Sequence, residues 1–215
     1  MTSVETQTAG ARLNDLLISA GSEPLEPAQS SSFEAYLSLI VRWNARVNLT
    51  AIRDEEGILS RHFVESIVCA RSLPAGIGTL LDFGSGAGFP GVPIALCRAE
   101  IAVTLAESQG KKAAFLQEAV RLLGITSHVY SGRAETLATQ FDCVTLRAVD
   151  RMHEATKAAS LLVRPGGWLA PMTTGAELAA LQDLVGPEYS WEEAVPLPGG
   201  EDRLVAIAKR ISLPA

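Results

Sequence analysis

The first third of the chain carries apolar residues at helical spacing. Apolar side chains recur every three or four residues over 33–47 and again over 54–72, and a shorter helix is expected over 11–20, where Gly21 would end it. The apolar stripe of each helix must be buried against another surface. Residues 1–75 are therefore predicted to form a helical extension that packs as a cap on the rest of the chain.

The remainder, residues 76–215, alternates between strand-like and helix-like patterns and is expected to be one structural unit. Strands are predicted at 79–83, 101–106, 127–130, 141–146 and 168–171. Helices are predicted at 92–99, 111–123, directly after Glu135, at 152–163 and at 177–185. Segments 191–195 and 204–208 would form a closing hairpin. This alternation predicts an α/β fold with a Rossmann-like, doubly wound, mostly parallel sheet of seven strands.

A glycine-rich loop follows the first predicted strand. That strand ends at Asp82, and Gly84, Gly86 and Gly88 then alternate before a predicted helix. Alternating glycines let the backbone turn sharply and pass close to a ligand, and the helix presents free N–H groups. A dinucleotide loop has the pattern G-x-G-x-x-G, but Phe89 stands where its third glycine is required. An acid at the strand end would repel a pyrophosphate but can hold an ammonium group. The loop therefore favours the amino-acid end of S-adenosylmethionine over a dinucleotide, and a plain glycine-rich surface turn is the alternative.

Further candidates stand where the other strands end, because ligands of doubly wound sheets bind at the carboxyl ends of the strands. The second strand ends at Glu107, whose carboxylate can accept hydrogen bonds from both ribose hydroxyls of an adenosine. The third leads to a turn with Ala134 and Glu135, which can face an adenine edge. The fourth ends at Arg147, whose guanidinium would be repelled by a sulfonium and is expected to meet a carboxylate or an RNA phosphate. The alternative for Glu107 is an acid that stabilises the start of the next helix. For Ala134 and Glu135 it is a plain helix N-cap region, and for Arg147 it is a surface ion pair.

The net charge of −6 argues at first against a nucleic-acid partner, because phosphate neutralisation supplies most non-specific affinity. The charge is unevenly distributed, however. Residues 110–164 carry eight Lys or Arg against five acids, whereas residues 177–202 carry seven acids and no base. The chain can therefore present one basic face, although a solvated helix surface explains the same pattern equally well.

The sequence offers no spacing typical of a metal site or of a hydrolase. Cys69, Cys97 and Cys143 lie far apart and are expected to be reduced, buried thiols. Ser85 does not lie in a G-x-S-x-G motif, and His62, on the apolar stripe of its helix, is expected to be a core or lining residue. The N-terminus lacks the layout of a signal peptide, and no apolar run is long enough to span a membrane, so a cytoplasmic location is expected.

Six motifs in one order resemble those of the ribosomal RNA small subunit methyltransferase G family, also called glucose-inhibited division protein B. They stand at 43–50, 61–66, 82–91, 110–112, 133–135 and 147–148. The resemblance covers roughly residues 33–170 and is much more specific than the glycine loop alone. Two positions depart from the family pattern, since Glu65 stands where Asp is expected and Leu146 where Ser is expected.

The resemblance implies a class I S-adenosylmethionine-dependent methyltransferase that modifies N7 of one guanine in 16S rRNA of the small ribosomal subunit. It implies cofactor contacts by Gly84, Phe89, Ala134, Glu135 and Arg147, to which the fold logic adds Asp82, Gly86 and Glu107. Candidate RNA contacts are Arg46, Lys111, Lys112, Arg133 and Arg151. Because guanine N7 has a lone pair and no proton to lose, no general base or metal is expected. A monomer is expected. The alternatives are a methyltransferase of the same fold that acts on a small molecule or protein, and a non-catalytic ribosome-assembly factor.

Overall fold

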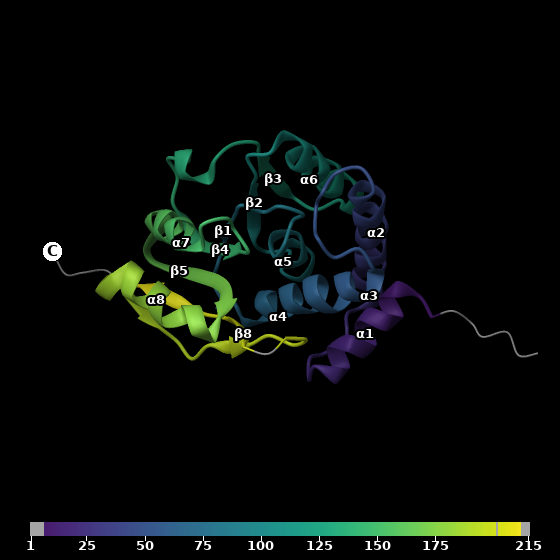
Figure 1. The fold of residues 1–215 in the computed structure, drawn as a ribbon, viewed down its shortest axis with the longest axis horizontal. Helices are drawn as coiled ribbons and strands as arrows, with labels where there is room; N and C mark the ends of the chain where they lie inside the picture. The colour runs from purple at the N-terminus through teal and green to yellow at the C-terminus, as the bar shows by residue number, and fades with distance from the viewer. Residues whose placement is uncertain (1–6, 201, 212–215) are drawn as a thin grey trace, which may run out of the picture.

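A computed structural model describes residues 7–200 and 202–211, with a β-sheet at the centre and helices on both faces (Figure 1). The strands pair in the order β3-β2-β1-β4-β5-β8-β7, and β9 pairs with β5 and β6. The parallel strands are β1 (Thr79–Phe83), β2 (Ala102–Ala106), β3 (Ser127–Tyr130), β4 (Phe141–Arg147) and β5 (Val163–Thr174). The antiparallel edge holds β6 (Tyr189–Trp191), β7 (Val195–Pro196), β8 (Arg203–Val205) and β9 (Ala208–Arg210). The predicted α/β fold with a mostly parallel sheet is confirmed.

The count of strands differs from the prediction because the two hairpin strands are interrupted. Residues 206–207 separate β8 from β9, and both of these strands pair with β5. In the same way, β6 and β7 share the place of the first hairpin strand. Within the described residues, nine short strands therefore occupy the seven predicted positions. Residues 164–167, which precede the strand predicted at 168–171, also lie inside β5, and the register against β4 shifts there.

The sheet has a topological switch point beside β1. The chain runs outward from β1 to β2 and β3, and then returns to pair β4 with the other side of β1. Crossovers on the two sides of such a point leave from opposite faces of the sheet and open a crevice at the carboxyl ends of the strands. Asp82 pairs with Leu105 of β2 and with Thr145 of β4, which places the end of β1 in the middle of this crevice.

Helices cover both faces of the sheet. On one face lie α5 (Gly91–Cys97) and α6 (Gly110–Leu123), and on the other lie α7 (Met152–Leu161) and α8 (Gly175–Val185) (Figure 1). Gly124 ends α6 with a positive φ of 62°, as its C-cap position predicts. The helix expected after Glu135 is one 3₁₀ turn, η2 (Ala134–Thr136). No helix within 7–200 and 202–211 combines the length and apolar character needed to cross a membrane.

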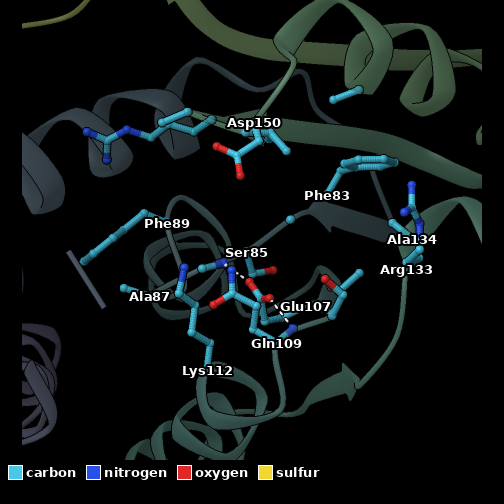
Figure 2. Close-up of a pocket in the computed structure, with 18 of the residues that line it drawn as sticks. Phe83, Ser85, Ala87, Phe89, Glu107, Gln109, Lys112, Arg133, Ala134 and Asp150 are labelled. Carbon is cyan, nitrogen blue, oxygen red and sulfur yellow. Dashed lines mark hydrogen bonds between the residues drawn. The ribbon is translucent and has the colours of Figure 1, made fainter. Parts of the chain in front are cut away.

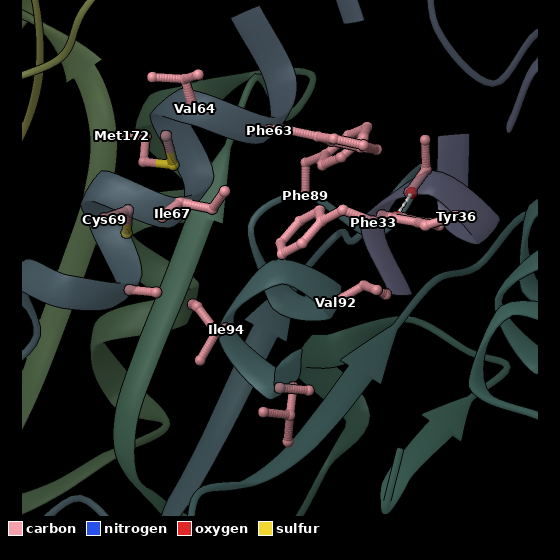
Figure 3. Close-up of a cluster of buried hydrophobic side chains, with 14 of the residues drawn as sticks. Phe33, Tyr36, Phe63, Val64, Ile67, Cys69, Phe89, Val92, Ile94 and Met172 are labelled. Atoms are coloured by element: carbon pink, nitrogen blue, oxygen red, sulfur yellow. Dashed lines mark hydrogen bonds between the residues drawn. The ribbon is translucent and has the colours of Figure 1, made fainter. Parts of the chain in front are cut away.

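The N-terminal helices form part of the layer over the first face. They are α1 (Ala9–Ser19), α2 (Pro27–Asn44), α3 (Glu55–Gly57), the π-helical η1 (Ile58–Val64) and α4 (Glu65–Ser72). The single helix predicted over 54–72 is thus a run of three segments with a π-helical middle. Ile67 and Cys69 of α4 belong to the same buried cluster as Met172 of β5 (Figure 3). The hydrophobic core therefore continues across the predicted boundary at residue 75.

An aromatic cluster joins the N-terminal helices to the glycine loop. The ring of Tyr36, on α2, is fully buried and stacks on Phe63 of η1 at 5.3 Å between ring centroids. It also lies close to the ring of Phe89 in the loop (Figure 3), at 5.7 Å between centroids. The ring of Phe115 on α6 is 6.4 Å away. Its hydroxyl donates a hydrogen bond to the carbonyl of Ala87. The shape of the loop therefore depends on helix α2 as well as on the sheet.

Candidate active site

A cavity of about 720 Å³ opens at the carboxyl ends of β1, β2 and β4, a size that suits a nucleoside-type ligand. Phe83 and Ala134 lie on one side of it and Phe89 on the other, with Glu107 between them (Figure 2). Seven of the eight predicted cofactor residues line this cavity, namely Gly84, Gly86, Phe89, Glu107, Ala134, Glu135 and Arg147. The strand-end reasoning thus brings residues from four separate segments to one place.

The glycines of the loop serve different purposes. Gly84, Gly86 and Gly88 all have positive φ values, of 71°, 57° and 89°. A Cβ on Gly86 would meet only the carbonyl of Gly84, at 3.9 Å, so this residue keeps the space above the loop open for a ligand. A Cβ on Gly88 would lie 2.7 Å from a methyl of Val92, so this glycine is required for packing. Gly86 therefore acts toward the cavity, whereas Gly88 serves the packing of the loop.

Asp82 lies beneath the loop and not in the cavity wall. It is fully buried, and its carboxylate accepts hydrogen bonds from the Gly91 N–H at 3.1 Å and from the Thr145 hydroxyl at 3.3 Å. Burial raises the pKa of this carboxyl to about 6. The structure thus corrects the expectation that Asp82 meets an ammonium group directly. Side chains alternate along a strand, so Asp82 shares the face of Leu80, whereas Phe83 points toward the cavity.

Glu107 connects the end of β2 to the glycine loop. Its Oε2 accepts a hydrogen bond from the Gly86 N–H at 3.0 Å, and its Oε1 accepts one from the Gln109 N–H at 2.6 Å. The side chain is 6% exposed and faces the cavity. Each carboxylate oxygen can accept a second hydrogen bond, so the pair of oxygens is available to a diol such as ribose.

The turn after β3 forms a further part of the wall. Ala134 is buried and Glu135 is exposed, and both line the cavity. The carboxylate of Glu135 lies 2.9 Å from Nη2 of Arg133. An exposed pair of this kind contributes little to stability, so Glu135 remains able to turn toward a ligand.

Arg147, at the end of β4, is held by one edge of its guanidinium. Its Nη2 donates to the carbonyl of Arg61 at 2.6 Å and to Oε2 of Glu65 at 2.8 Å. Its Nη1 is buried and has no hydrogen-bond partner within 7–200 and 202–211. The guanidinium carbon lies 6.0 Å from the centre of the Phe89 ring. The guanidinium thus pairs with a carboxylate of the protein itself, that of Glu65, 82 residues earlier in the chain, which the sequence did not indicate.

Thr50, which sequence reasoning did not assign to the site, and His62, which was expected to be a core or lining residue, also line the cavity. The His62 ring stacks on Phe89 at 4.6 Å, and its Nε2 lies 2.7 Å from the Thr50 hydroxyl. The loop that carries Thr50 is held by Asn44, whose side-chain oxygen accepts from the N–H groups of Leu49 and Thr50. The buried Asn44 and the apolar stripe around His62 are the sequence signals for this wall.

Comparison with known proteins assigns the chain to a family. The family model described as rRNA small subunit methyltransferase G, GidB, matches residues 29–185. The chain belongs to this family. A curated relative named ribosomal RNA small subunit methyltransferase G, from Roseiflexus sp. (strain RS-1), is 42% identical over 202 residues, which cover 86% of this chain and 85% of the relative. A protein of the same name from Xanthomonas oryzae pv. oryzae is 38% identical over 195 residues, with 87% and 90% covered.

Solved structures similar to this member of the methyltransferase G family show its fold class. A methyltransferase from Pyrococcus furiosus matches with a TM-score of 0.62 at 13% identity and covers 85% of this chain and 100% of its own. A SAM-dependent methyltransferase from Aquifex aeolicus matches with a TM-score of 0.56 at 16% identity, with 72% and 93% covered. The fold is that of class I S-adenosylmethionine-dependent methyltransferases.

The five basic residues expected to contact RNA do not all border the cavity of this methyltransferase G family member. Lys112, Arg133 and Arg151 line it. Lys111 is exposed on the first turn of α6, and Arg46 borders a separate groove of about 320 Å³ beside Trp43 and Glu118. Within the described residues, no group of three or more His, Cys, Asp or Glu side chains is arranged to hold a metal ion.

His62 should make the protein sensitive to acid. Burial, and then the charges of Arg147, Arg61 and Arg203, lower the pKa of this imidazole from 6.5 to about 3. Between these two pH values the unfolded chain binds a proton that the folded protein does not, so stability falls as the pH is lowered. We expect the wild type to lose roughly 2 kcal/mol more than His62→Gln between pH 7 and pH 4.5, in urea unfolding. Equal losses in the two proteins would show that His62 titrates normally in the folded state.

Proposed function

We propose that this protein transfers the methyl group of S-adenosylmethionine to N7 of one guanine in the 16S rRNA of the small ribosomal subunit. One observation carries the proposal. In a chain of the methyltransferase G family, the loop at Gly86, the carboxylate of Glu107 and the guanidinium of Arg147 converge on a single cavity of suitable size. The names of the relatives support ribosomal RNA of the small subunit as the substrate.

Each end of the cofactor has a chemically matched part of the cavity. Glu107 would bind the ribose hydroxyls, and the turn with Ala134 and Glu135 would face the adenine edge. Arg147, which also lines the cavity, would donate to the carboxylate of the methionyl part. The open space above Gly86 allows the ligand to approach the loop backbone. When bound, the cofactor supplies a methyl group activated by a sulfonium.

The reaction requires positioning more than proton transfer. As the bond from guanine N7 to the methyl carbon forms, the sulfur–carbon bond breaks, and the positive charge passes from the sulfonium to the guanine ring. No proton leaves N7, so no general base is needed. His62 fits this scheme, because its imidazole is neutral at physiological pH and its Nε2 is engaged by Thr50. We assign His62 and Phe89 to shaping the wall beside the reacting atoms.

The RNA would approach from the rim of the cavity, where Lys112, Arg133 and Arg151 lie. Such side chains bind phosphates and orient a nucleic acid without reading its sequence. Binding to RNA should weaken steeply as salt is raised, because each phosphate contact releases counterions. A methyltransferase that acts on an uncharged small molecule would lack this dependence.

The decisive test is methyl transfer to ribosomal RNA. The protein is incubated with labelled S-adenosylmethionine and with small subunits, or 16S rRNA, that lack the modification, and the nucleosides are analysed by mass spectrometry. We expect a gain of about one 7-methylguanosine per 16S rRNA, and no gain with Arg147→Ala. A methylated nucleoside other than 7-methylguanosine would contradict the assigned atom. An absence of methylation on both substrates would contradict the proposed function.

A further inference from the structure

Glu65 is a buried carboxylate surrounded by three arginines from separate parts of the fold. It begins helix α4 and is 1% exposed. Its Oε2 accepts from Arg147 of β4 at 2.8 Å, and its Oε1 accepts from Nη2 of Arg203, which begins β8 in the C-terminal hairpin. The Nε of Arg61 on η1 lies 3.4 Å from the same Oε1. The cluster thus connects the N-terminal helices, the central sheet and the hairpin at the back of the cavity.

This cluster is not a balanced ion pair. Three guanidiniums face one carboxylate, and the side chains of Arg147 and Arg203 are only 12% and 19% exposed. Placing several charges in such a site is costly unless each is paired and hydrogen-bonded. Among the described residues, Nη1 of Arg147 nevertheless has no hydrogen-bond partner, and neither have the buried Nε atoms of Arg61 and Arg203. This excess of positive charge suits an anionic ligand, which would pair with a guanidinium of the cluster when it binds.

We propose that Glu65 is a positioning residue, which fixes the guanidinium of Arg147 in the wall of the cavity, and that Arg203 supports it. Two acceptors, Oε2 of Glu65 and the carbonyl of Arg61, hold Nη2 and thereby set the plane of the guanidinium. Arg203 holds the second oxygen of Glu65, which fixes the rotation of the carboxylate. The inference rests on the proposed function in that the anion that Arg147 meets is the carboxylate of the cofactor.

The C-terminal hairpin thereby becomes part of the cofactor site, although it does not line the cavity. Arg203 stands 138 residues after Glu65 and outside residues 29–185, which the family model matches. Its Nη2 also lies 3.4 Å from the carbonyl of Gly199, so the hairpin turn and the cluster are joined. A change in this hairpin should therefore alter cofactor affinity through Glu65 and Arg147.

The test compares the affinity for S-adenosylmethionine, by calorimetry on the full chain, across a double-mutant cycle of Glu65→Gln and Arg147→Ala. Glutamine keeps the shape of Glu65 but removes its charge. We expect Glu65→Gln to raise the Kd at least about 10-fold when Arg147 is present, and less than about 2-fold when Arg147 is already alanine. The effects of two substitutions that act through the same contact are not additive. Arg203→Met should raise the Kd in the same direction by a smaller factor. Glu65→Asp, which keeps the charge, should restore most of the affinity lost in Glu65→Gln.

Glu188→Gln is the matched control, since Glu188 also faces an arginine, Arg210 at 3.6 Å, but lies at the far edge of the sheet. It should leave the Kd unchanged. The inference is overturned if Glu65→Gln binds the cofactor like the wild type, or if it weakens binding equally with and without Arg147. If Glu65→Gln does not melt cooperatively, and so is not folded, the cycle is made with Arg203→Met and Arg147→Ala instead. The same two outcomes then decide. A wild-type protein that binds no S-adenosylmethionine would instead overturn the proposed function, and this inference with it.

Discussion

Gly86→Val should raise the Kd for S-adenosylmethionine at least about 100-fold, a loss of about 2.7 kcal/mol in binding free energy, while the protein stays folded. The Cβ position of Gly86 faces open space at the cavity, so valine methyl groups would occupy the volume that the ligand needs. The N–H of Gly86 also donates to Glu107, so a shift of the loop would disturb the proposed ribose contact as well. Calorimetry on the purified variant measures the loss.

Valine at this position also strains the backbone, because Gly86 has a φ of 57°. Gly124→Val controls for this effect. Gly124 has a similar φ of 62°, has no atom within 4 Å of its Cβ position, and lies at the end of α6 away from the cavity. It should lose a similar amount of stability and keep its affinity for the cofactor. Wild-type affinity in Gly86→Val would refute the role of the loop, and an equal loss in Gly124→Val would assign the effect to strain.

The parts of the site that lie at the ends of parallel strands could be predicted from the sequence. Glu107 and Arg147 are each the residue at or just beyond the end of a predicted strand, and parallel strands bring their carboxyl ends to one edge. Knowledge of the strands was therefore enough to bring these side chains together. Asp82 was misplaced although the same pattern held the answer, since a two-residue period puts it on the face of Leu80, toward α5.

Contacts between distant segments could not be predicted in this way. Nothing near Glu65 in the sequence indicates that Arg147 and Arg203 will surround it, because these pairings arise only when the hairpin joins the edge of the sheet and α4 packs on one of its faces. The π-helical turn that carries His62 is likewise invisible to a pattern with a period of 3.6 residues. The apolar stripe indicates that His62 is a core or lining residue, but its contact with Thr50 in one wall is seen only in the tertiary structure.

Tyr36→Ala should cause the largest loss of stability of any single change considered for this protein, about 3–5 kcal/mol, because it removes a fully buried ring from the aromatic cluster and leaves a cavity. For a chain of this size the loss corresponds to roughly 10 °C in Tm. Val41→Ala, on the same helix but 40% exposed, should change the Tm by less than about 2 °C. Equal shifts in the two variants, measured by thermal unfolding followed by circular dichroism, would show that the cluster does not stabilise the fold.

Tyr36→Phe separates the ring from its hydroxyl. The phenylalanine keeps the stacking with Phe63 and Phe89 but leaves the buried carbonyl of Ala87 without its donor, which should cost about 1–2 kcal/mol. That carbonyl lies in the loop, between Gly86 and Gly88, so the variant should bind S-adenosylmethionine several-fold more weakly at temperatures where it is fully folded. Unchanged affinity would mean that helix α2 stabilises the loop only by covering it. A loss of affinity would mean that the N-terminal helices hold the loop in its binding conformation, and that the cap and the cofactor cavity form one cooperative unit.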